Sequence, residues 1–562
     1  MERIPFVGLH AHSGVGSPFD GFGYPKDHMN YAHSNGAKAL ALTDHGNMNG
    51  LVYQVMHAKK MQAEGKDFKP IFGVEAYFIP SVAEWKEQIE VFRKDKKLAK
   101  QIDKEQSGTT IENEGASKGI TKHDINKRRH LVLLAQNQTG LNNIFKMVSK
   151  SYTGDNFYRY PRIDLALLEE YGEGVIAASA CLGGVYAGCY WENRDEGPEA
   201  ILNCMLKVTE EMQAVMGDRW YGELQWNNIP EQHELNQYII QVHERTGLKL
   251  ISTCDSHYPS PEAWQSRELY KRLGWLGRKP EWASMELPLT VDEVGYELYP
   301  KNGNQMWDSY KSYSKACGVT YNDDIVYQSI IETATIAFDR IESFLPDTTV
   351  RLPDFVVPAG TDATSYLGQL AFEGLLSVLG SKGIKQNSPQ FKDYNKRLNS
   401  ELDVINAQGF AKYFLTMKAI VDKTSEVQLA GPGRGSAAGS LVAYALEITQ
   451  VDPIEYGLLF SRFLRTDQTD MPDIDYDVSD PMVLKEKLIE DWGDDVVVPI
   501  SNWNTLQLKS LIKDVSRLYE IPFAEVNPVT SKMIYEATPL AKARHGIKAG
   551  VYTPTLSEVM EF

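Results

Sequence analysis

The first 260 residues contain seven short apolar or β-branched runs, and most of the stretches between them have helical periodicity. The runs are 4–9, 38–43, 70–79, 130–135, 174–180, 219–225 and 248–253. The helical patterns cover 51–64, 141–152, 199–216 and 231–246. A repeated alternation of strand and helix is typical of a parallel sheet with helices on its outside. Seven such units in succession predict an α/β fold whose sheet closes into a barrel.

The composition of the chain is that of a globular protein. Its 562 residues, 43% hydrophobic and 24% charged, are enough for three or four domains with their own cores. The net charge of −17 argues against attraction of the whole surface to nucleic acid or to an anionic membrane, but it allows a local basic groove. No run approaches 18 apolar residues, and five cysteines are too few and too scattered for a disulfide framework. We expect a soluble protein of a reducing compartment, the cytoplasm, with no membrane partner.

One segment interrupts the alternation. In residues 84–129, 21 of 46 residues are charged, and the middle of the segment has no apolar periodicity. These properties predict a surface insertion without chemistry of its own; the alternative is a basic flap near nucleic acid.

Side chains that bind metal ions stand at the ends of the predicted strands. They are His10, His12, Asp20, His45, Glu75, His130, Cys181, Asp255 and His257. Residues i and i+2 of a strand face the same way, so His10 with His12, and Asp255 with His257, can each converge on one point. A single histidine of this kind is usually only solvated, and a single cysteine is more often a small buried apolar residue. Together at one edge of a barrel, however, these residues predict a cluster of Zn²⁺ or Mn²⁺ ions.

The same motifs resemble those of a known family, the polymerase-and-histidinol-phosphatase (PHP) domain that opens bacterial replicative DNA polymerases. The matching motifs are GLHAHS, FDG, LTDHG, GVEAYF, RRHLVLLA, SACLGG and CDSHY. The resemblance implies that the nine residues named above bind up to three ions of Zn²⁺ or Mn²⁺. Because all nine are chemically competent ligands, it also implies the branch of the family that is a metal-dependent 3′–5′ exonuclease.

The second half carries a glycine-rich loop. An extended connection at 346–361 and helical patterns at 363–380, 391–407 and 411–424 come first, and the loop then leads into an apolar helix predicted at 436–447. Gly431, Gly433 and Gly435 let the backbone approach an anion, while Arg434 and the helix start near Ser436 suit phosphate.

Three other interpretations of the loop can be weighed. The lysine of a Walker A loop is absent. A dinucleotide-binding fold needs a second parallel strand soon after the helix, whereas 454–464 has a helix-like pattern. A purely structural helix cap remains open.

An acidic segment follows the loop by about 40 residues. On a strand, Asp473, Asp475 and Asp477 would project from one face. Such a patch is tolerable in water at a loop edge, but it would be stabilised by Mg²⁺, which prefers oxygen ligands. A phosphate loop next to paired carboxylates is the layout expected for nucleotidyl transfer with two metal ions.

This half resembles the palm domain of the DNA polymerase III alpha subunits in QGFAKYFLTMKAIV, GPGRGSAAGSLVAYAL, VDPIEYGLLFSRFL and MPDIDYD. The resemblance implies that Arg434, Gly435 and Ser436 bind nucleotide phosphates and that Asp473 and Asp475 are catalytic and hold two Mg²⁺ ions. Asp477 matches a third acidic position that is not counted as catalytic. Residues 504–520 look like the start of the thumb, and the resemblance implies that Lys509 faces DNA. Residues 465–468 and the segment before Lys509 depart from the family pattern.

Together these features predict a seven-stranded (βα) PHP barrel, a nucleotidyltransferase-like α+β palm and the beginning of a helical thumb. The expected boundaries are 1–285 (with the insertion 84–129), 286–500 and 501–562. The function implied is that of the amino-terminal portion of a replicative DNA polymerase with a 3′–5′ exonuclease. Its partners would be primer-template DNA, dNTPs and a second polypeptide that supplies a third catalytic aspartate, the fingers and contact with a sliding clamp. Without that polypeptide we expect negligible primer extension.

Two alternatives stay open. One is a stand-alone metal-dependent exonuclease or phosphoesterase in which the palm-like half docks DNA. The other is a scaffold stabilised by metal, which is disfavoured because nine ligands exceed the four of a closed structural zinc site.

Overall fold

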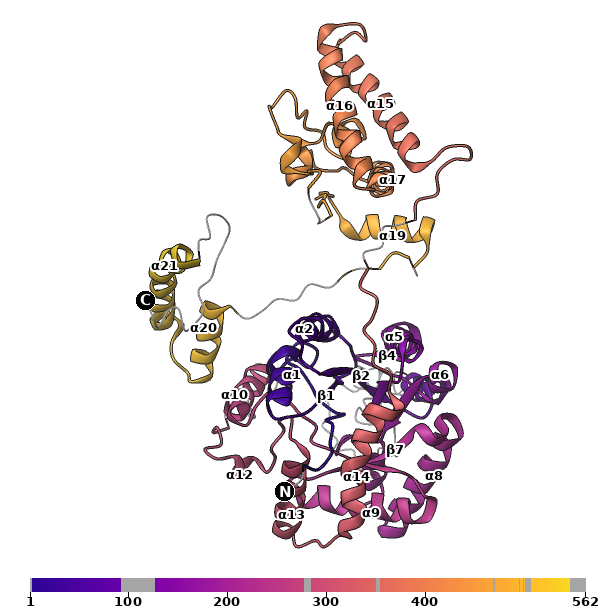
Figure 1. Cartoon of the computed structure of the whole chain (residues 1–562), viewed down its shortest axis with the longest axis vertical. Coiled ribbons are helices and arrows are strands. Elements are labelled where there is room, and N and C mark those ends of the chain that lie inside the picture. The colour runs from indigo at the N-terminus through magenta and orange to yellow at the C-terminus, as the bar shows by residue number, and fades with distance from the viewer. Residues whose placement is uncertain are drawn as a thin grey trace, which may run out of the picture. The chain divides into compact units, whose positions relative to one another are not determined.

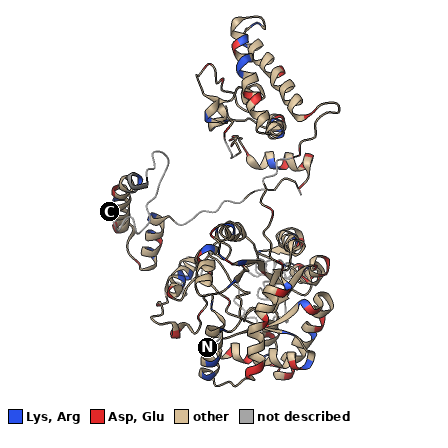
Figure 2. Ribbon diagram, in the orientation of Figure 1, with Lys and Arg blue, Asp and Glu red and all other residues tan. Residues whose placement is uncertain are grey.

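The structure is a computed structural model and describes residues 3–91, 94, 127–276, 285–349, 354–467, 471–494, 496–498, 500 and 507–545. It divides into two compact units (Figure 1). One unit runs to Pro346 and also contains helices α20 (Leu508–Leu518) and α21 (Phe523–His545); the other spans Asp347–Thr505. Positive and negative side chains are interspersed over the helices of both units (Figure 2).

The first unit is built on a curled sheet of six strands in the order β1-β2-β3-β6-β7-β8. The strands are β1 (Ala39–Leu42), β2 (Lys69–Phe78), β3 (Arg129–Ala135), β6 (Val175–Ala178), β7 (Trp220–Gln225) and β8 (Leu250–Thr253). Neighbouring strands are parallel except at β3, which is antiparallel to both β2 and β6. The prediction of a fully parallel sheet is therefore wrong at this strand. Because β3 is reversed, its first residues lie at the edge where its neighbours end.

The amino-terminal segment joins the two edges of this sheet. It was predicted as a strand at 4–9, but it pairs only through isolated bridges, from Gly8 to Leu40 and from Ala11 to Ser256. Gly8 O accepts a hydrogen bond from Ala41 N (2.8 Å), and His12 N donates one to Ser256 O (2.7 Å). The segment thus lies between β1 and β8, so the barrel is closed by a bridging chain instead of a seventh regular strand.

Helices surround the sheet (Figure 1). In chain order they are α1 (Pro25–Ser34), α2 (Leu51–Ala63), α5 (Gln138–Ser151), α6 (Leu165–Tyr171), α7 (Val185–Glu192), α8 (Pro198–Met216), α9 (Pro230–Thr246), α10 (Trp264–Trp275), α12 (Val291–Val294), α13 (Gly303–Ala316) and α14 (Asp323–Thr335), with a small hairpin of β4 (Phe157–Tyr158) and β5 (Tyr160–Pro161). Successive side chains of β3 point to opposite faces of the sheet, so they belong to two different hydrophobic clusters. Leu133 belongs to the outer cluster together with Leu141 of α5, whereas Val132 and Leu134 fill the inside of the barrel.

The first unit extends beyond residue 285, where the sequence analysis placed a boundary. Val7 N donates to Thr333 Oγ1 (3.1 Å), and the hydroxyls of Ser252 and Ser329 lie 2.7 Å apart. These bonds tie α14 to the barrel, and α13 packs on α14. Helical periodicity indicates that a helix buries one face, but it does not identify the neighbour against which that face packs.

Only the two ends of the charged insertion, 84–91 with residue 94 and 127–129, lie within the described residues. At the first of these ends, Val82, Trp85 and Ile89 form a small buried cluster with Ile79. The remaining part of the predicted insertion, 92–126 except residue 94, lies outside the described residues.

Cys189 of α7 and Cys204 form a disulfide with a Cα–Cα distance of 5.6 Å, which differs from the expectation of reduced cysteines. Among the described helices, none is both long enough and apolar enough to cross a membrane.

The second unit is mainly helical in its described part. Its helices are α15 (Ala363–Ser381), α16 (Pro389–Ala407), α17 (Ala411–Val427), α18 (Leu441–Ala445) and α19 (Pro481–Trp492), with 3₁₀ turns at Ser436–Gly439 and Phe460–Arg462. The first three confirm the helical patterns seen in the sequence. The single helix predicted at 436–447 is wrong, because Ser440 adopts an extended conformation that ends the 3₁₀ turn and caps α18. The helix-like run 454–464 forms turns around Gly457, whose φ is +64°, and a 3₁₀ turn.

Candidate metal centre and phosphate loop

All nine predicted metal ligands meet at one edge of the barrel. His10 and His12 come from the bridging segment, Asp20 from the loop after it, and His45 follows β1. Glu75 lies in β2 and His130 in β3, while Cys181 follows β6, and Asp255 and His257 follow β8. The reversed direction of β3 brings His130 to this edge from the start of its strand.

Glu75 is at the centre of the cluster and is fully buried. Its Oε2 lies 2.9 Å from His10 Nε2, 2.9 Å from His12 Nε2 and 3.3 Å from His45 Nδ1. Its Oε1 contacts His130 Nδ1. One carboxylate therefore faces four imidazoles that come from three parts of the chain: the bridging segment, the end of β1 and the start of β3.

Two further carboxylates complete the cluster. Asp255 Oδ1 lies 3.1 Å from His12 Nε2, 3.3 Å from His10 Nε2 and 3.5 Å from His257 Nδ1. Asp20 Oδ2 lies 3.0 Å from His45 Nε2 and 3.6 Å from His257 Nε2.

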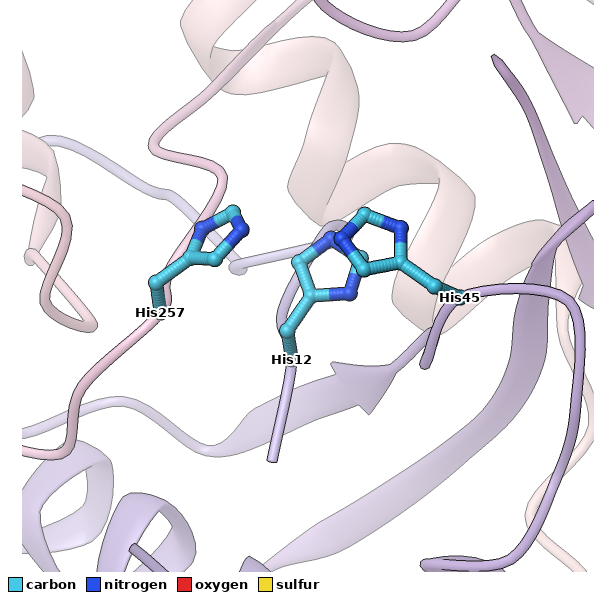
Figure 3. A group of neighbouring side chains, drawn as sticks. All are labelled: His12, His45 and His257. Atoms are coloured by element: carbon cyan, nitrogen blue, oxygen red, sulfur yellow. The ribbon is translucent and has the colours of Figure 1, made fainter. Parts of the chain in front are cut away.

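The imidazole rings of the cluster are in direct contact. The ring of His12 is 4.1 Å from that of His45 and 4.5 Å from that of His257, centroid to centroid (Figure 3). Cys181 joins through His130, with Sγ 3.6 Å from Nδ1. Every predicted ligand thus touches at least one other.

The chemistry of the donor set fits divalent cations. Three overlapping groups each bring three or four ligand atoms within 4.8 Å of one another: His12, His45 and His257; His10, His12, Glu75 and Asp255; and His45, Glu75 and His130. Within the described structure, His12 Nε2, His45 Nδ1 and Asp255 Oδ1 are buried and close to one another's side chains, yet none of them makes a hydrogen bond of good geometry. Buried polar atoms are rarely left so, and a cation among them would satisfy all three.

Sequence analysis missed the residue that orients His10. His10 Nδ1 donates to Glu223 Oε1 (2.8 Å), and the same oxygen accepts from Thr253 Oγ1 (2.5 Å). This bond leaves Nε2 of His10 for the centre, as is usual for metal-binding histidines. The pattern of 219–225 predicts a strand and does not mark Glu223 as a functional residue. A glutamate in the middle of a fully buried strand was the available signal.

Arg267 of α10 holds Asp20 in place. Its Nη2 donates to Asp20 Oδ1 (2.6 Å) and its Nε to Asp20 O (2.8 Å). Arg267 is 4% exposed, so the position of Asp20 depends on a buried side chain more than 240 residues away in sequence.

The electrostatics of the centre favour a bound cation. Burial alone would lower the pKa of His10, but the carboxylates of Asp255 and Glu223 outweigh it and raise that pKa well above its usual value. Burial would raise the pKa of Glu75, yet His130 and His45 hold it well below its usual value. Burial and the charges of Glu75 and Asp255 raise the pKa of the Cys181 thiol. Divalent cations would take the place of the imidazole protons and stabilise the thiolate.

In the second unit, the glycine-rich loop lies against the acidic segment. Gly431 N donates to Asp477 O (3.0 Å), and Arg434 Nε pairs with Asp477 Oδ2 (2.6 Å). Gly435 has a φ of +60°, and a Cβ there would lie 2.2 Å from Asp475 Oδ2. Only glycine allows this close approach at this backbone conformation.

The acidic segment alternates as expected of an extended chain. Asp473 and Asp475 are exposed, whereas Ile474 between them is 9% exposed and belongs to the core. Ser436 is exposed at the start of the 3₁₀ turn. Lys509 lies on α20, which belongs to the first unit.

A buried carboxylate behind the loop was not foreseen. Glu401 of α16 is 1% exposed and accepts hydrogen bonds from Arg397 Nε (2.6 Å), Ser440 Oγ (2.9 Å) and Val442 N (3.1 Å). It fixes the junction between the 3₁₀ turn and α18.

Two protein families match different parts of the chain. The PHP domain family matches residues 8–226, which include seven of the nine candidate ligands and the barrel from the bridging segment through β7. The family described as the bacterial DNA polymerase III alpha NTPase domain matches residues 365–553.

Relatives named DNA polymerase III subunit alpha match along nearly the whole chain. The protein of Aquifex aeolicus (strain VF5) is 33% identical over 525 residues, which cover 92% of this chain and 40% of that protein. Those of Borreliella burgdorferi and Thermus aquaticus are 31% and 29% identical and cover 94% and 93% of this chain. The chain belongs to the DNA polymerase III alpha family and corresponds to an amino-terminal portion, spanning about 40% of the length of these relatives.

Proposed function

We propose that this chain is the amino-terminal portion of a replicative DNA polymerase and that its PHP domain is a 3′–5′ exonuclease. The observation that supports the exonuclease best is the complete set of nine ligands gathered around Glu75 and Asp255. Bound Zn²⁺ or Mn²⁺ would activate a water molecule and stabilise charge on a phosphodiester. The chain's own residues fix the geometry, since Glu223 orients His10 and Arg267 holds Asp20.

We expect this activity to depend on metal. A 5′-labelled primer with a recessed 3′ end, incubated with the chain and Mn²⁺ or Zn²⁺, should be shortened one nucleotide at a time. Removal of the ions with EDTA should lower the rate by at least about a thousandfold, because several kcal/mol of transition-state stabilisation are lost. Restoring the ions should restore the rate. Unchanged shortening by the chelated chain would contradict the assignment.

In the second unit, we propose that the loop of Arg434, Gly435 and Ser436 binds the phosphates of a dNTP and that Asp473 and Asp475 are catalytic and hold two Mg²⁺ ions. The close approach of Gly435 to Asp475 supports this arrangement. On this proposal the partners are primer-template DNA, which Lys509 contacts, and a further polypeptide. That polypeptide would supply the third aspartate, the fingers and the link to a sliding clamp, and the place of action would be the cytoplasm. If the second unit only docks DNA, the same primer with dNTPs will be shortened even when that polypeptide is added.

Gly435→Ala tests this second site. The new Cβ would displace the Asp475 carboxylate from the loop, so we expect the affinity for Mg²⁺-dNTP to fall about tenfold, measured by calorimetry. Gly409→Ala is the matched control: its φ is +74°, but a Cβ there meets nothing within 4 Å, so it has the backbone strain without the collision. Equal affinities in the two variants would count against a nucleotide site at this loop.

A further inference from the structure

The metal centre opens on the side of Asp20 and His130. The side chain of Asp20 is 42% exposed and that of His130 is 22% exposed, whereas the other histidine and carboxylate side chains of the cluster are at most 14% exposed. A substrate must therefore approach past these two residues. The side chains next to them are in position to touch the part of the substrate that adjoins the reacting phosphate.

Phe19, the residue before Asp20, is exposed and has an unusual backbone conformation. It is 40% exposed, and its φ of +65° is a backbone conformation that a residue with a bulky side chain rarely adopts. Its ring stacks on Tyr270 of α10, with the centroids 4.9 Å apart and the planes inclined by 28°. Gly274 makes room for it, because a Cβ at that position would lie 2.4 Å from Phe19 Cβ. The ring is thus held against α10 and remains partly open to solvent, on the residue next in sequence to the exposed ligand Asp20.

Near His130, a cationic side chain, that of Arg128, stacks on aromatic rings. The guanidinium of Arg128 lies 3.6 Å from the ring centroid of Tyr160 and 5.1 Å from that of Tyr77. The Tyr77 ring is in turn 5.4 Å from that of His130 and 6.4 Å from that of His45. A single aromatic ring therefore separates Arg128 from two of the metal ligands.

These two features match the two parts of a nucleotide. An exposed aromatic ring stacks on a nucleobase of any sequence, and a guanidinium supported by aromatic rings binds phosphate. We propose that Phe19 and Arg128 form a subsite for the terminal nucleotide of a single strand, Phe19 stacking on its base and Arg128 binding the adjoining phosphate. The inference rests on the proposed nuclease function. It adds that the terminal base leaves the duplex before it binds, since a base within a duplex does not offer its face to Phe19.

Binding without hydrolysis tests the subsite in the full chain. In EDTA, a fluorescent oligo(dT) of five residues should bind Phe19→Leu about tenfold more weakly than the wild type, because leucine keeps apolar volume and backbone strain but has no aromatic face. Phe19→Gly, which removes the strain, should lose the same affinity. An oligonucleotide whose last residue is abasic should bind all three proteins equally. Arg128→Gln should weaken the binding of both oligonucleotides. Phe338→Ala, an exposed aromatic beside Lys69 at the opposite end of β2, should change neither.

The outcomes separate the two proposals. If wild-type chain with Mn²⁺ shortens the oligonucleotide but Phe19→Leu and Phe19→Gly bind it normally, the subsite is refuted and the nuclease stands. If the variants lose base-dependent binding but the wild type releases no nucleotide, the nuclease is refuted and the subsite stands. An equal loss for the normal and the abasic oligonucleotide would also refute the subsite, because it would show that Phe19 acts only on the fold of the loop.

Discussion

Glu75→Gln should lower metal-dependent hydrolysis by about three orders of magnitude or more. The side chain keeps its size, but it loses the negative charge that faces His10, His12 and His45. Its neutral amide is also a weaker ligand for a divalent cation than the carboxylate it replaces. Because the ligand groups around Asp255 and around His130 share Glu75, one substitution weakens both. The loss of several kcal/mol of charge stabilisation corresponds to a rate effect of this size.

The measurement is the initial rate of nucleotide release with saturating Mn²⁺, together with the metal content of the dialysed protein. We expect both to fall in Glu75→Gln. Glu64→Gln is the matched control, since Glu64 is a surface residue after α2 that pairs with Lys66, and it should leave both unchanged. Normal metal content and rate in Glu75→Gln would show that the cluster around this carboxylate does not bind the catalytic ions.

The gathering of several candidate ligands could be predicted from sequence because local geometry places them. His10 and His12 share a face through the two-residue period of an extended chain, and Glu75 lies in a run that is clearly a strand. The connections between the elements could not be predicted. The reversal of β3 depends on how the segment after β2 returns, and the pattern of 84–129 gives no information on that path.

The residues that support the site were harder to find than the ligands. Glu223 and Arg267 act through partners that lie 213 and 247 residues away in sequence, so no local pattern marks them. The helix predicted at 436–447 shows a different limit. Its apolar residues do pack in the core, but the extended backbone at Ser440 and its bond to Glu401 divide the helix in two. A tertiary contact here overrides helix propensity.

That contact also determines the largest change in stability that we expect. Glu401→Ala should lower the free energy of unfolding of the second unit by about 3 kcal/mol, since removing one member of a buried charged pair leaves the other groups unsatisfied. Three donors lose their acceptor at once: Arg397 Nε, Ser440 Oγ and Val442 N. Glu401→Gln keeps an acceptor for the two donors near α18 and should cost less.

Hydrogen exchange resolves the effect by region. Amides of 441–446 should exchange faster in Glu401→Ala, whereas those of β2 and β3 in the first unit should keep the wild-type rate. Glu373→Ala on α15 is the control, because Glu373 is exposed and its bond is to Gln369 one turn earlier, so its effect should stay within about 0.5 kcal/mol. Unchanged exchange at 441–446 would mean that Glu401 does not anchor this junction. On the proposal that the glycine-rich loop binds the phosphates of a dNTP, the same variant should also bind Mg²⁺-dNTP more weakly, because the loop runs directly into that junction.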